Sequence, residues 1–200
     1  MIGMSVVAPM ILLKNNMSKI ILGFVGPLAS GKEEAKKYLV TKYRAGAHRF
    51  SIILRDILNR LYLPISRENL QYLSLDLRNR FGSDTLARVI AEDVKNDDHE
   101  IVVIDGIRRS DDIVSLKDLP NFYLIAIDAD PQIRYTRLKL RNENAGDDQK
   151  TFANFIADGQ KEAELEISSV MKNSQYQINN DGSLEDLYQQ IDRIIEIINR

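Results

Sequence analysis

The segment Gly26-Pro27-Leu28-Ala29-Ser30-Gly31-Lys32-Glu33 follows the apolar run Ile20–Val25 and precedes a stretch with helical periodicity. It fits the pattern G-x-x-x-x-G-K, in which the next residue is ordinarily Ser or Thr and is here Glu33. In this pattern a glycine-rich loop joins a buried strand to a helix, and the backbone N–H groups of the loop and of the helix N-terminus bind phosphate. The sequence therefore predicts a phosphate-binding loop in which Lys32 reaches the phosphate oxygens.

Four more short apolar runs predict strands of the kind that is buried on both faces of a parallel sheet. They lie at residues 49–54, 101–104, 122–127 and 176–178. Between them, apolar residues recur with helical spacing. Five strands that alternate with helices predict an α/β fold in three layers, with a five-stranded parallel sheet, right-handed crossovers and helices on both faces. One domain over residues 17–200 is expected.

Capping residues and breakers predict where the helices lie. The helix that begins at Lys32 is expected to end before Gly46, and a short helix at residues 56–61 ends before Pro64. Ser66 and Ser83 are candidate N-caps for the next two helices. The remaining helices are expected after Asp130-Pro131, over residues 152–171, and after a capping box at residues 183–186.

The composition excludes several functional classes. Of the 200 residues, 44% are hydrophobic and 28% charged, and no apolar run is long enough to span a bilayer. The absence of cysteine excludes disulfides and thiolate metal sites and is consistent with a cytoplasmic protein. His48 and His99 lack the spacing of a metal-ligand pair and are assigned no function. The net charge of −2 argues against a nucleic-acid partner.

The N-terminal residues 1–16 are expected to be a disordered extension of the domain. They contain an apolar stretch at residues 6–13, but no basic residue precedes it as in a secretory signal. Translation from Met1 and from Met17 are both compatible with the sequence.

Polar residues follow the predicted strands at the edge of the sheet where ligands bind in α/β folds. Asp105 and Asp128 each come directly after a strand. Arg108 and Arg109 follow Asp105 closely, and Arg55 lies near the second predicted strand. A guanidinium binds a terminal phosphate with two parallel hydrogen bonds, and phosphoryl transfer needs positive charge around the transferred group. These arginines are therefore candidate ligands of an acceptor phosphate.

Three motifs together resemble the P-loop nucleoside monophosphate kinases, including their adenylate-kinase-related, deoxynucleoside monophosphate kinase-like and dephospho-CoA-kinase-like relatives. They are the loop at residues 26–32, the run Ile104-Asp105-Gly106-Ile107-Arg108-Arg109, and Arg137-Leu138-Lys139-Leu140-Arg141. The resemblance covers nearly all of residues 19–200. It implies transfer of a phosphoryl group from ATP to a nucleoside or deoxynucleoside monophosphate, with Mg²⁺ as cofactor.

The resemblance also assigns roles to residues. Asp105 orients Mg²⁺ through water, Arg109 holds the acceptor phosphate, Arg137 stacks on adenine, and Arg141 contacts phosphates. Acceptor-binding helices are expected at about residues 54–95 and a small lid at about residues 141–162. The implied catalytic residues are Lys32, Asp105, Arg109 and Arg141. The implied ATP-binding residues are Gly26, Pro27, Leu28, Ala29, Ser30, Gly31, Lys32, Glu33, Arg137 and Arg141. The implied acceptor-binding residues are Arg55, Gln71, Arg78, Arg108 and Arg109.

Two features depart from the family pattern. Glu33 replaces the hydroxyl that ordinarily binds magnesium, and a carboxylate at close range repels the nucleotide phosphates. We expect Glu33 to turn into solvent, with Ser30 or Asp105 helping to hold the metal. Residues 142–164 contain only Lys150 and Lys161 as basic residues, whereas adenylate-kinase-type lids carry further arginines.

These departures leave alternatives open. A dephospho-CoA kinase or another small-molecule kinase uses the same donor site. A nucleotide sensor without turnover is compatible with Glu33 and with an arginine-poor lid, and a P-loop protein that processes nucleic acid is the alternative least supported by the net charge. The base and sugar of the acceptor and the oligomeric state are not specified by the sequence.

Overall fold

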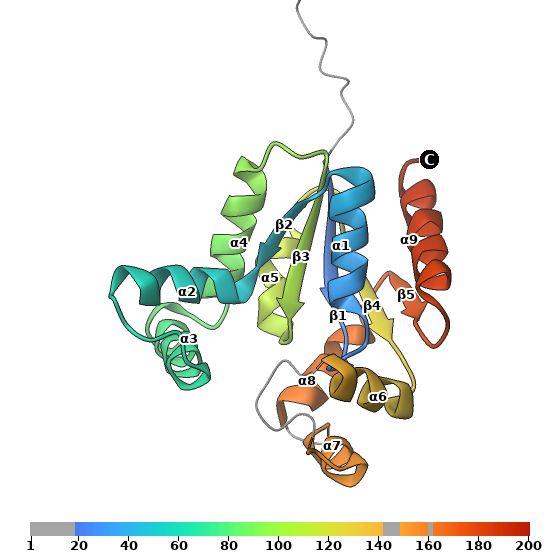
Figure 1. Ribbon diagram of the computed structural model, residues 1–200. Helices are drawn as coiled ribbons and strands as arrows, with labels where there is room; N and C mark the ends of the chain where they lie inside the picture. The colour runs from blue at the N-terminus through green and yellow to red at the C-terminus, as the bar shows by residue number, and fades with distance from the viewer. Residues whose placement is uncertain (1–18, 142–148, 160–161) are drawn as a thin grey trace, which may run out of the picture.

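The computed structural model describes residues 19–141, 149–159 and 162–200 (Figure 1). The extension expected at residues 1–16 lies outside the described residues, as does the polar part of the expected lid at residues 142–148. No helix in the described ranges is long and apolar enough to cross a membrane.

A five-stranded parallel sheet forms the centre of the molecule, as the sequence predicts (Figure 1). Its strands lie in the order β2-β3-β1-β4-β5. The first strand, β1, is buried throughout and pairs on one side with β3 and on the other with β4. All carboxyl ends therefore meet at one edge, where β1 runs into the glycine-rich loop. The strands are β1 (Ile20–Val25), β2 (Gly46–Arg49), β3 (Ile101–Ile107), β4 (Phe122–Asp128) and β5 (Tyr176–Asn179).

Helices cover both faces of this sheet and make two separate apolar cores. On one face, α1 (Lys32–Tyr43) and α9 (Leu184–Ile198) pack on alternate residues of the strands. On the other face lie α4 (Thr85–Asn96), α5 (Val114–Lys117) and α8 (Glu162–Met171). Both layers are needed because the central strands are apolar on both sides. The three-layer prediction is confirmed.

A polar cluster joins the two helices of the first face. The carboxylate of Asp192 accepts hydrogen bonds from the Tyr38 hydroxyl at 2.9 Å, from the Tyr43 hydroxyl at 2.8 Å and from Lys42 Nζ at 2.7 Å. The ring of Tyr38 stacks on that of Tyr188, with centroids 3.9 Å apart. Partial burial raises the pKa of Asp192, but the three donors outweigh it, so the pKa lies below its ordinary value. Burial and the Asp192 carboxylate raise the pKa of Tyr43 to about 12.

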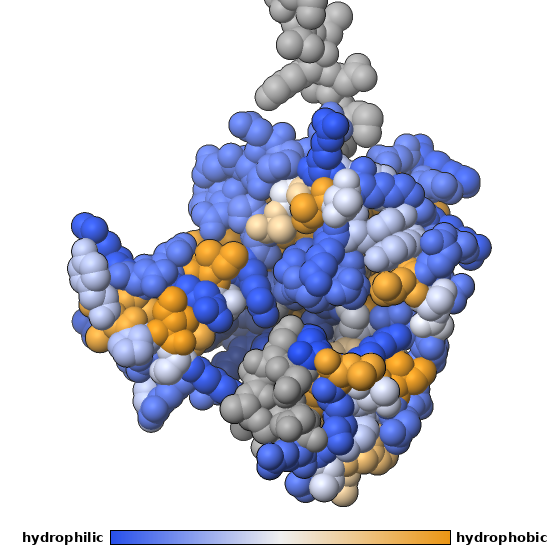
Figure 2. Space-filling model, in the orientation of Figure 1, coloured by the Kyte–Doolittle hydropathy of each residue, from blue (hydrophilic) through white to orange (hydrophobic). Residues whose placement is uncertain are grey.

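Two helices project from the sheet as an arm, formed by α2 (Phe50–Arg60) and α3 (Arg67–Phe81) (Figure 1). No residue of α3 is buried, and apolar side chains remain exposed over the arm (Figure 2). Tyr62 at its tip is 90% exposed and Tyr72 is 60% exposed. On the other side of the sheet edge, α6 (Pro131–Arg141) and α7 (Phe152–Asp158) lie near the end of β4 (Figure 1).

The sequence prediction for the second strand is wrong in its boundaries. Residues 49–54 were expected to be a strand, but β2 ends at Arg49 and a single helix begins at Phe50. Phe50, Leu54 and Leu58 recur every four residues and are all buried, so the helical period outweighs the strand propensity of the two isoleucines between them. The short helix expected at residues 56–61 is the second half of α2.

The caps are confirmed with one exception. Ser66 Oγ accepts a hydrogen bond of 3.1 Å from the Asn69 N–H, and Ser183 forms the expected capping box with Asp186. Ser83 is not the cap of α4, because the helix begins one residue later and Asp84 occupies the N-cap. The helix expected over residues 152–171 is divided into α7 and α8, and a short 3-10 turn, η1 (Ser110–Ile113), precedes α5 without a sequence signal.

Candidate functional site

Lys32 lies against the glycine-rich loop and is hydrogen-bonded to its backbone. Lys32 Nζ donates hydrogen bonds to Gly26 O at 2.7 Å and to Pro27 O at 2.9 Å. Gly26 has no room for a side chain, because a Cβ there would lie 2.0 Å from Ile127 O of the neighbouring strand. The ammonium therefore lies over the concave side of the loop, and it can exchange these carbonyl contacts for phosphate oxygens.

A buried residue outside the loop, which no sequence motif indicated, forms a hydrogen bond with the loop. Asn180 is only 3% exposed, and its Nδ2 donates a hydrogen bond of 2.8 Å to Ser30 O. Its own N–H donates to Asp128 O at 2.7 Å. At Gly31 the φ angle is +107°, and a Cβ would lie 2.0 Å from Asn180 Nδ2. The available signal was positional, since Asn180 directly follows β5, as Asp105 and Asp128 directly follow the strands predicted at residues 101–104 and 122–127.

Ser30 does not have the position expected of a metal ligand. It is fully buried, and its Oγ lies 3.5 Å from Lys32 Nζ beneath the loop. Among the described residues, no group of three or more histidine or carboxylate side chains is arranged to hold a metal ion. Asp105, which was expected directly after the strand, lies within β3 two residues before its end, and its role as a magnesium ligand stays a prediction.

Asp105 lies beside two cationic side chains, one of which also pairs with a second carboxylate. It is 5% exposed, with Arg49 Nε 3.5 Å and Lys36 Nζ 4.0 Å from its Oδ2. Lys36 Nζ also donates a hydrogen bond of 2.6 Å to Glu33 Oε2. Neither Arg49 nor Lys36 was expected at the site, because neither belongs to a recognised motif. We call Glu33, Lys36, Arg49 and Asp105 the Glu33–Asp105 cluster.

Glu33 was expected to turn into solvent; its side chain is 37% exposed, and its carboxylate accepts the hydrogen bond from Lys36. Partial burial raises the pKa of Glu33, but the hydrogen bond from Lys36 and the charges of Lys36, Arg49 and Lys37 outweigh it. The pKa therefore lies below its ordinary value, and Glu33 stays ionised at neutral pH. The repulsion expected between this carboxylate and a nucleotide is offset by adjacent cations.

On the other side of the cluster, a tight turn presents Arg108 and Arg109. The N–H groups of both residues donate to Asp112 Oδ2, at 2.9 and 3.0 Å. Asp112 is 2% exposed and accepts a further hydrogen bond of 2.6 Å from Arg78 Nη2 through Oδ1. The side chains of Arg108 and Arg109 are exposed, and Arg109 Nε lies 3.7 Å from Glu166 Oε2 of α8.

Arg78 therefore has a different position from the one expected. Its side chain is 9% exposed, and Nη1 donates to Ser83 O in addition to the pair with Asp112. A guanidinium engaged in this way supports the turn from beneath and is not open to an acceptor. Arg55 on α2 and Gln71 on α3 are exposed on the arm, and no described contact brings them to the turn.

Arg137 lies on the opposite flank, where α6 faces the segment after β5. It is half-buried, and its Nη1 has no hydrogen-bond partner among the described residues. The N–H of Asp130, a hydrogen bond with Asn179 and the charge of Arg137 hold the pKa of Asp181 below its ordinary value. This Nη1 atom is itself buried, and the nucleotide contact expected of Arg137 stays a prediction. Arg141 ends α6 and is exposed.

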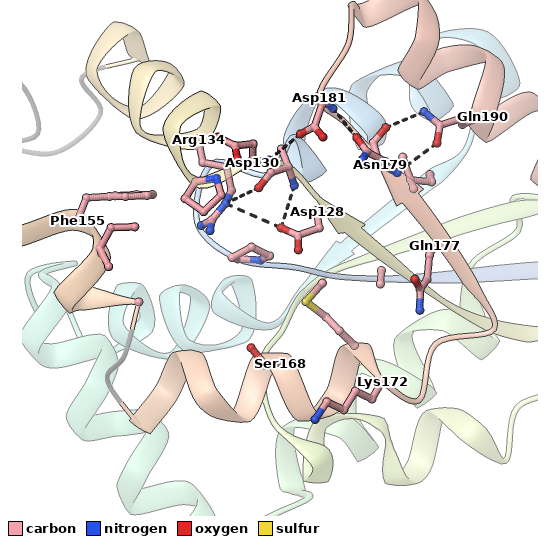
Figure 3. Close-up of a pocket in the computed structure, with 18 residues that line it drawn as sticks. Asp128, Asp130, Arg134, Phe155, Ser168, Lys172, Gln177, Asn179, Asp181 and Gln190 are labelled. Atoms are coloured by element: carbon pink, nitrogen blue, oxygen red, sulfur yellow. Dashed lines mark hydrogen bonds and ion pairs between the residues drawn. The ribbon is translucent and has the colours of Figure 1, made fainter. Parts of the chain in front are cut away.

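A pocket of about 910 Å³ adjoins the loop through Pro27 (Figure 3). It lies between the ends of β4 and β5 and helices α6 to α8, with Arg134 and Asp128 at one side and Lys172 at the other. Arg134 joins α6 to the loop, because its Nε donates to Ala129 O at 2.9 Å and its Nη1 to Leu28 O at 3.4 Å. Neither Lys32 nor Asp105 lines this pocket.

Comparison with solved structures supports the class that the fold and loop define. The shikimate kinase of Bacteroides thetaiotaomicron has a TM-score of 0.57 and 14% identity, over 90% of this chain and 99% of that one. The shikimate kinase of Acinetobacter baumannii, solved with shikimate, has a TM-score of 0.53 and 16% identity, over 90% and 95%. At these identities the likeness concerns the fold alone, and it makes this protein a P-loop kinase-fold protein.

Sequence comparison gives the family. The chain is 31% identical over 186 residues to the UPF0200 protein of Pyrococcus abyssi, covering 90% of this chain and 96% of that relative. It is 29% identical over 182 residues to the UPF0200 protein of Saccharolobus solfataricus, covering 89% and 93%. The chain therefore belongs to the UPF0200 protein family. No family model matches it.

Proposed function

We propose that the protein transfers the γ-phosphoryl group of ATP to a nucleoside or deoxynucleoside monophosphate. The observation that carries the proposal is that the phosphate loop and the Arg108–Arg109 turn follow adjacent strands, β1 and β3, at the same edge of the sheet. Donor and acceptor phosphates bound at these two places lie across Asp105. This arrangement suits a reaction that depends on positioning and on positive charge.

Each part of the site has a role in this proposal. Lys32 and the backbone N–H groups of the loop bind the β- and γ-phosphates. Asp105 would help to hold Mg²⁺ through water, and the ion would supply positive charge to the transferred group. Arg109 and Arg108 bind the acceptor phosphate. An acceptor phosphate oxygen then forms a bond to the γ-phosphorus as the bond to the bridging oxygen of ADP breaks. Arg137 and Arg141 bind the nucleotide from the side of α6.

The fixed turn supports an anionic acceptor. Asp112 holds the N–H groups of Arg108 and Arg109 at hydrogen-bond distance, so the two exposed guanidinium groups project from a rigid base. A rigid base reduces the conformational entropy lost when these side chains bind phosphate. Arg55 and Gln71 on the arm are candidate contacts for the remainder of the acceptor.

A second candidate function is phosphorylation of a small-molecule hydroxyl group or of dephospho-CoA. The observation that favours it is the fold likeness to the two shikimate kinases. A nucleotide sensor without turnover is the third candidate, since Glu33 replaces the metal-binding hydroxyl.

Turnover across an acceptor panel tests the proposal. We would incubate the protein with ATP and Mg²⁺ and each of the ribo- and deoxymonophosphates, dephospho-CoA and shikimate, and follow ADP formation and the phosphorylated product by ³¹P NMR. Transfer to a monophosphate that Lys32→Ala abolishes supports the proposal. Transfer only to dephospho-CoA or shikimate replaces it with the second candidate, and tight ATP binding without transfer to any acceptor replaces it with the third.

A further inference from the structure

The Glu33–Asp105 cluster contains two cations that no phosphate-loop motif requires. Lys36 lies one helical turn after Lys32 on α1, and Arg49 is the last residue of β2. Both side chains reach the Asp105 carboxylate, Arg49 at 3.5 Å and Lys36 at 4.0 Å. Two elements that are distant in sequence thus bring positive charge to the same carboxylate beside the phosphate loop.

The position of Arg49 is fixed by the sheet. In the β2–β3 register the Cα atoms of Arg49 and Asp105 are direct partners. Its ion pair uses Nε, whereas 49% of the Arg49 side chain is exposed and only 7% of the Asp105 side chain is. One edge of the guanidinium is therefore held by Asp105, and the other edge is open toward the solvent. A guanidinium held in this way is preorganised to bind an anion.

Lys36 is held between two carboxylates. Its Nζ lies 2.6 Å from Glu33 Oε2 and 4.0 Å from Asp105 Oδ2, and its side chain is 18% exposed. By comparison, the neighbouring Lys37 is 59% exposed and pairs with Glu34 on the surface of α1. The helical spacing of four residues places Lys36 on the same face of α1 as Lys32.

Lys36 and Arg49 balance the negative charge next to the phosphate loop. The loop carries Glu33 in place of a neutral hydroxyl, so the cluster next to the loop contains two carboxylates, Glu33 and Asp105. The positive charges of Lys36 and Arg49 balance the two carboxylates, so the cluster has no net charge. Without these two cations, the negative charges of Glu33 and Asp105 would repel the nucleotide phosphates. The segment 142–164 supplies two lysines and no arginine as further positive charge.

We propose that Arg49 and Lys36 are catalytic residues that bind the phosphoryl group during transfer. Arg49 keeps Nε on Asp105 and donates its terminal N–H groups to the equatorial oxygens of the phosphoryl group. Lys36 moves from Glu33 toward the same oxygens, one turn beyond Lys32. These cations supply the charge stabilisation that lid arginines supply in adenylate-kinase-type enzymes. The inference rests on the proposed phosphoryl transfer.

The first test uses transition-state analogue binding, which needs no acceptor. We would measure the affinity for ADP and Mg²⁺ by calorimetry, with and without aluminium fluoride, whose planar anion mimics the transferred group. Wild type should bind ADP more tightly with aluminium fluoride. Arg49→Gln and Lys36→Met should each lose at least about tenfold of that gain, with affinity for ADP alone changed less than about threefold. The matched controls Arg60→Gln and Lys37→Met should keep the gain.

A second variant pair separates phosphate binding from neutralisation of Glu33. If Lys36 only neutralises Glu33, then Lys36→Met costs nothing once Glu33→Ser has removed the carboxylate. We expect the loss of analogue binding to persist in the Glu33→Ser, Lys36→Met double variant. Melting curves establish that each variant is folded, and Arg49→Lys provides a conservative replacement if Arg49→Gln does not fold.

The outcomes are distinct. Analogue binding by Arg49→Gln or Arg49→Lys equal to that of wild type overturns the role of Arg49, and full rescue by Glu33→Ser overturns the role of Lys36. Failure of wild type to phosphorylate any acceptor refutes the proposed function, whereas the absence of any gain with aluminium fluoride in folded wild type overturns this inference. If the gain in ADP affinity with aluminium fluoride depends on Lys32 but on neither Arg49 nor Lys36, then only the phosphate loop binds the analogue and the inference is refuted.

Discussion

Asn180 and Ser30 are joined by a hydrogen bond of 2.8 Å between Nδ2 and the carbonyl oxygen, across 150 positions of sequence. Both residues are buried, and the Asn180 N–H also binds Asp128 O at the end of β4. The shape of the phosphate loop therefore depends on the segment after the last strand. A loop whose conformation is fixed by this hydrogen bond keeps its N–H groups in position to bind a phosphate before the ligand arrives.

Asn180→Ala is expected to lower both stability and ATP affinity. The substitution leaves the buried Ser30 carbonyl without this donor, which costs about 1–3 kcal/mol of unfolding free energy. Urea unfolding and titration with a fluorescent ATP analogue measure the two effects. Asn173→Ala is the matched control, because Asn173 is exposed two residues after α8 and its Nδ2 likewise donates to a backbone carbonyl, Ser169 O. Unchanged ATP affinity in a destabilised Asn180→Ala variant would show that the loop keeps its shape without this hydrogen bond.

Lys32→Ala is expected to abolish transfer while the fold is retained. The ammonium hydrogen-bonds to the loop carbonyls of Gly26 and Pro27, and Lys32 belongs to neither apolar core, so its removal opens no cavity in the cores. Loss of a phosphate-binding donor lowers kcat by at least about 100-fold. Lys37→Ala, on the exposed side of the same helix, should retain activity. Normal turnover by Lys32→Ala would contradict the assignment of the loop.

Arg109→Ala is expected to raise the KM for the acceptor far more than the KM for ATP. Its exposed side chain belongs to the turn after β3 and pairs at 3.7 Å with Glu166. Because Glu166 competes with the acceptor for this guanidinium, Glu166→Gln should lower the acceptor KM modestly. Steady-state kinetics with each substrate varied in turn provide the measurement. Equal increases in both KM values for Arg109→Ala would refute its assignment to the acceptor.

Asp112→Asn is expected to destabilise the protein strongly. Asp112 and Arg78 form a buried ion pair with side chains 3% and 9% exposed, so the substitution leaves an uncompensated buried guanidinium. Breaking such a pair costs about 3–5 kcal/mol of unfolding free energy. Urea unfolding compares it with Asp111→Asn, the less buried neighbouring carboxylate. A cost equal to that of Asp111→Asn would mean that the turn does not depend on the pair.

Acid should weaken the contact between α1 and α9. The pKa of Asp192 lies below its ordinary value of 3.8, so its contribution to stability is fully present above that value and is lost as pH falls through the lower folded-state pKa. Asp192→Asn should remove this part of the acid dependence. Urea unfolding of wild type and variant at several pH values between about 2 and 7 measures it. Parallel pH profiles for the two proteins would contradict this role.

The fold could be predicted because its signals are local. The apolar runs, the glycine-rich loop and the Ser66 and Ser183 caps each specify their element within a few residues, and the alternation of strand and helix specifies the parallel sheet. The sequence did not indicate the start of α2, because Ile52 and Ile53 have strand propensity. Burial of Phe50, Leu54 and Leu58 decides the helical conformation.

The candidate site was predictable only in part. Lys32, Asp105 and Arg109 stand in motifs, but Arg49, Lys36 and Asn180 reach the site through strand register and packing between elements distant in sequence. Arg78 was expected to bind the acceptor and is instead paired with Asp112 of the turn after β3. Such pairings depend on tertiary structure, and no single-sequence pattern contains them.

β1 lies in the middle of the sheet, so it cannot form its strand pairs until strands later in the sequence have been synthesised. β1 is complete at Val25, yet its two partners are β3, which ends at Ile107, and β4, which ends at Asp128. A nascent chain that contains the phosphate loop therefore exposes an unpaired apolar strand until more than half of the protein has been synthesised. During that interval the strand is open to intermolecular pairing, so translation speed and chaperone binding should influence the yield of this protein more than its final stability does.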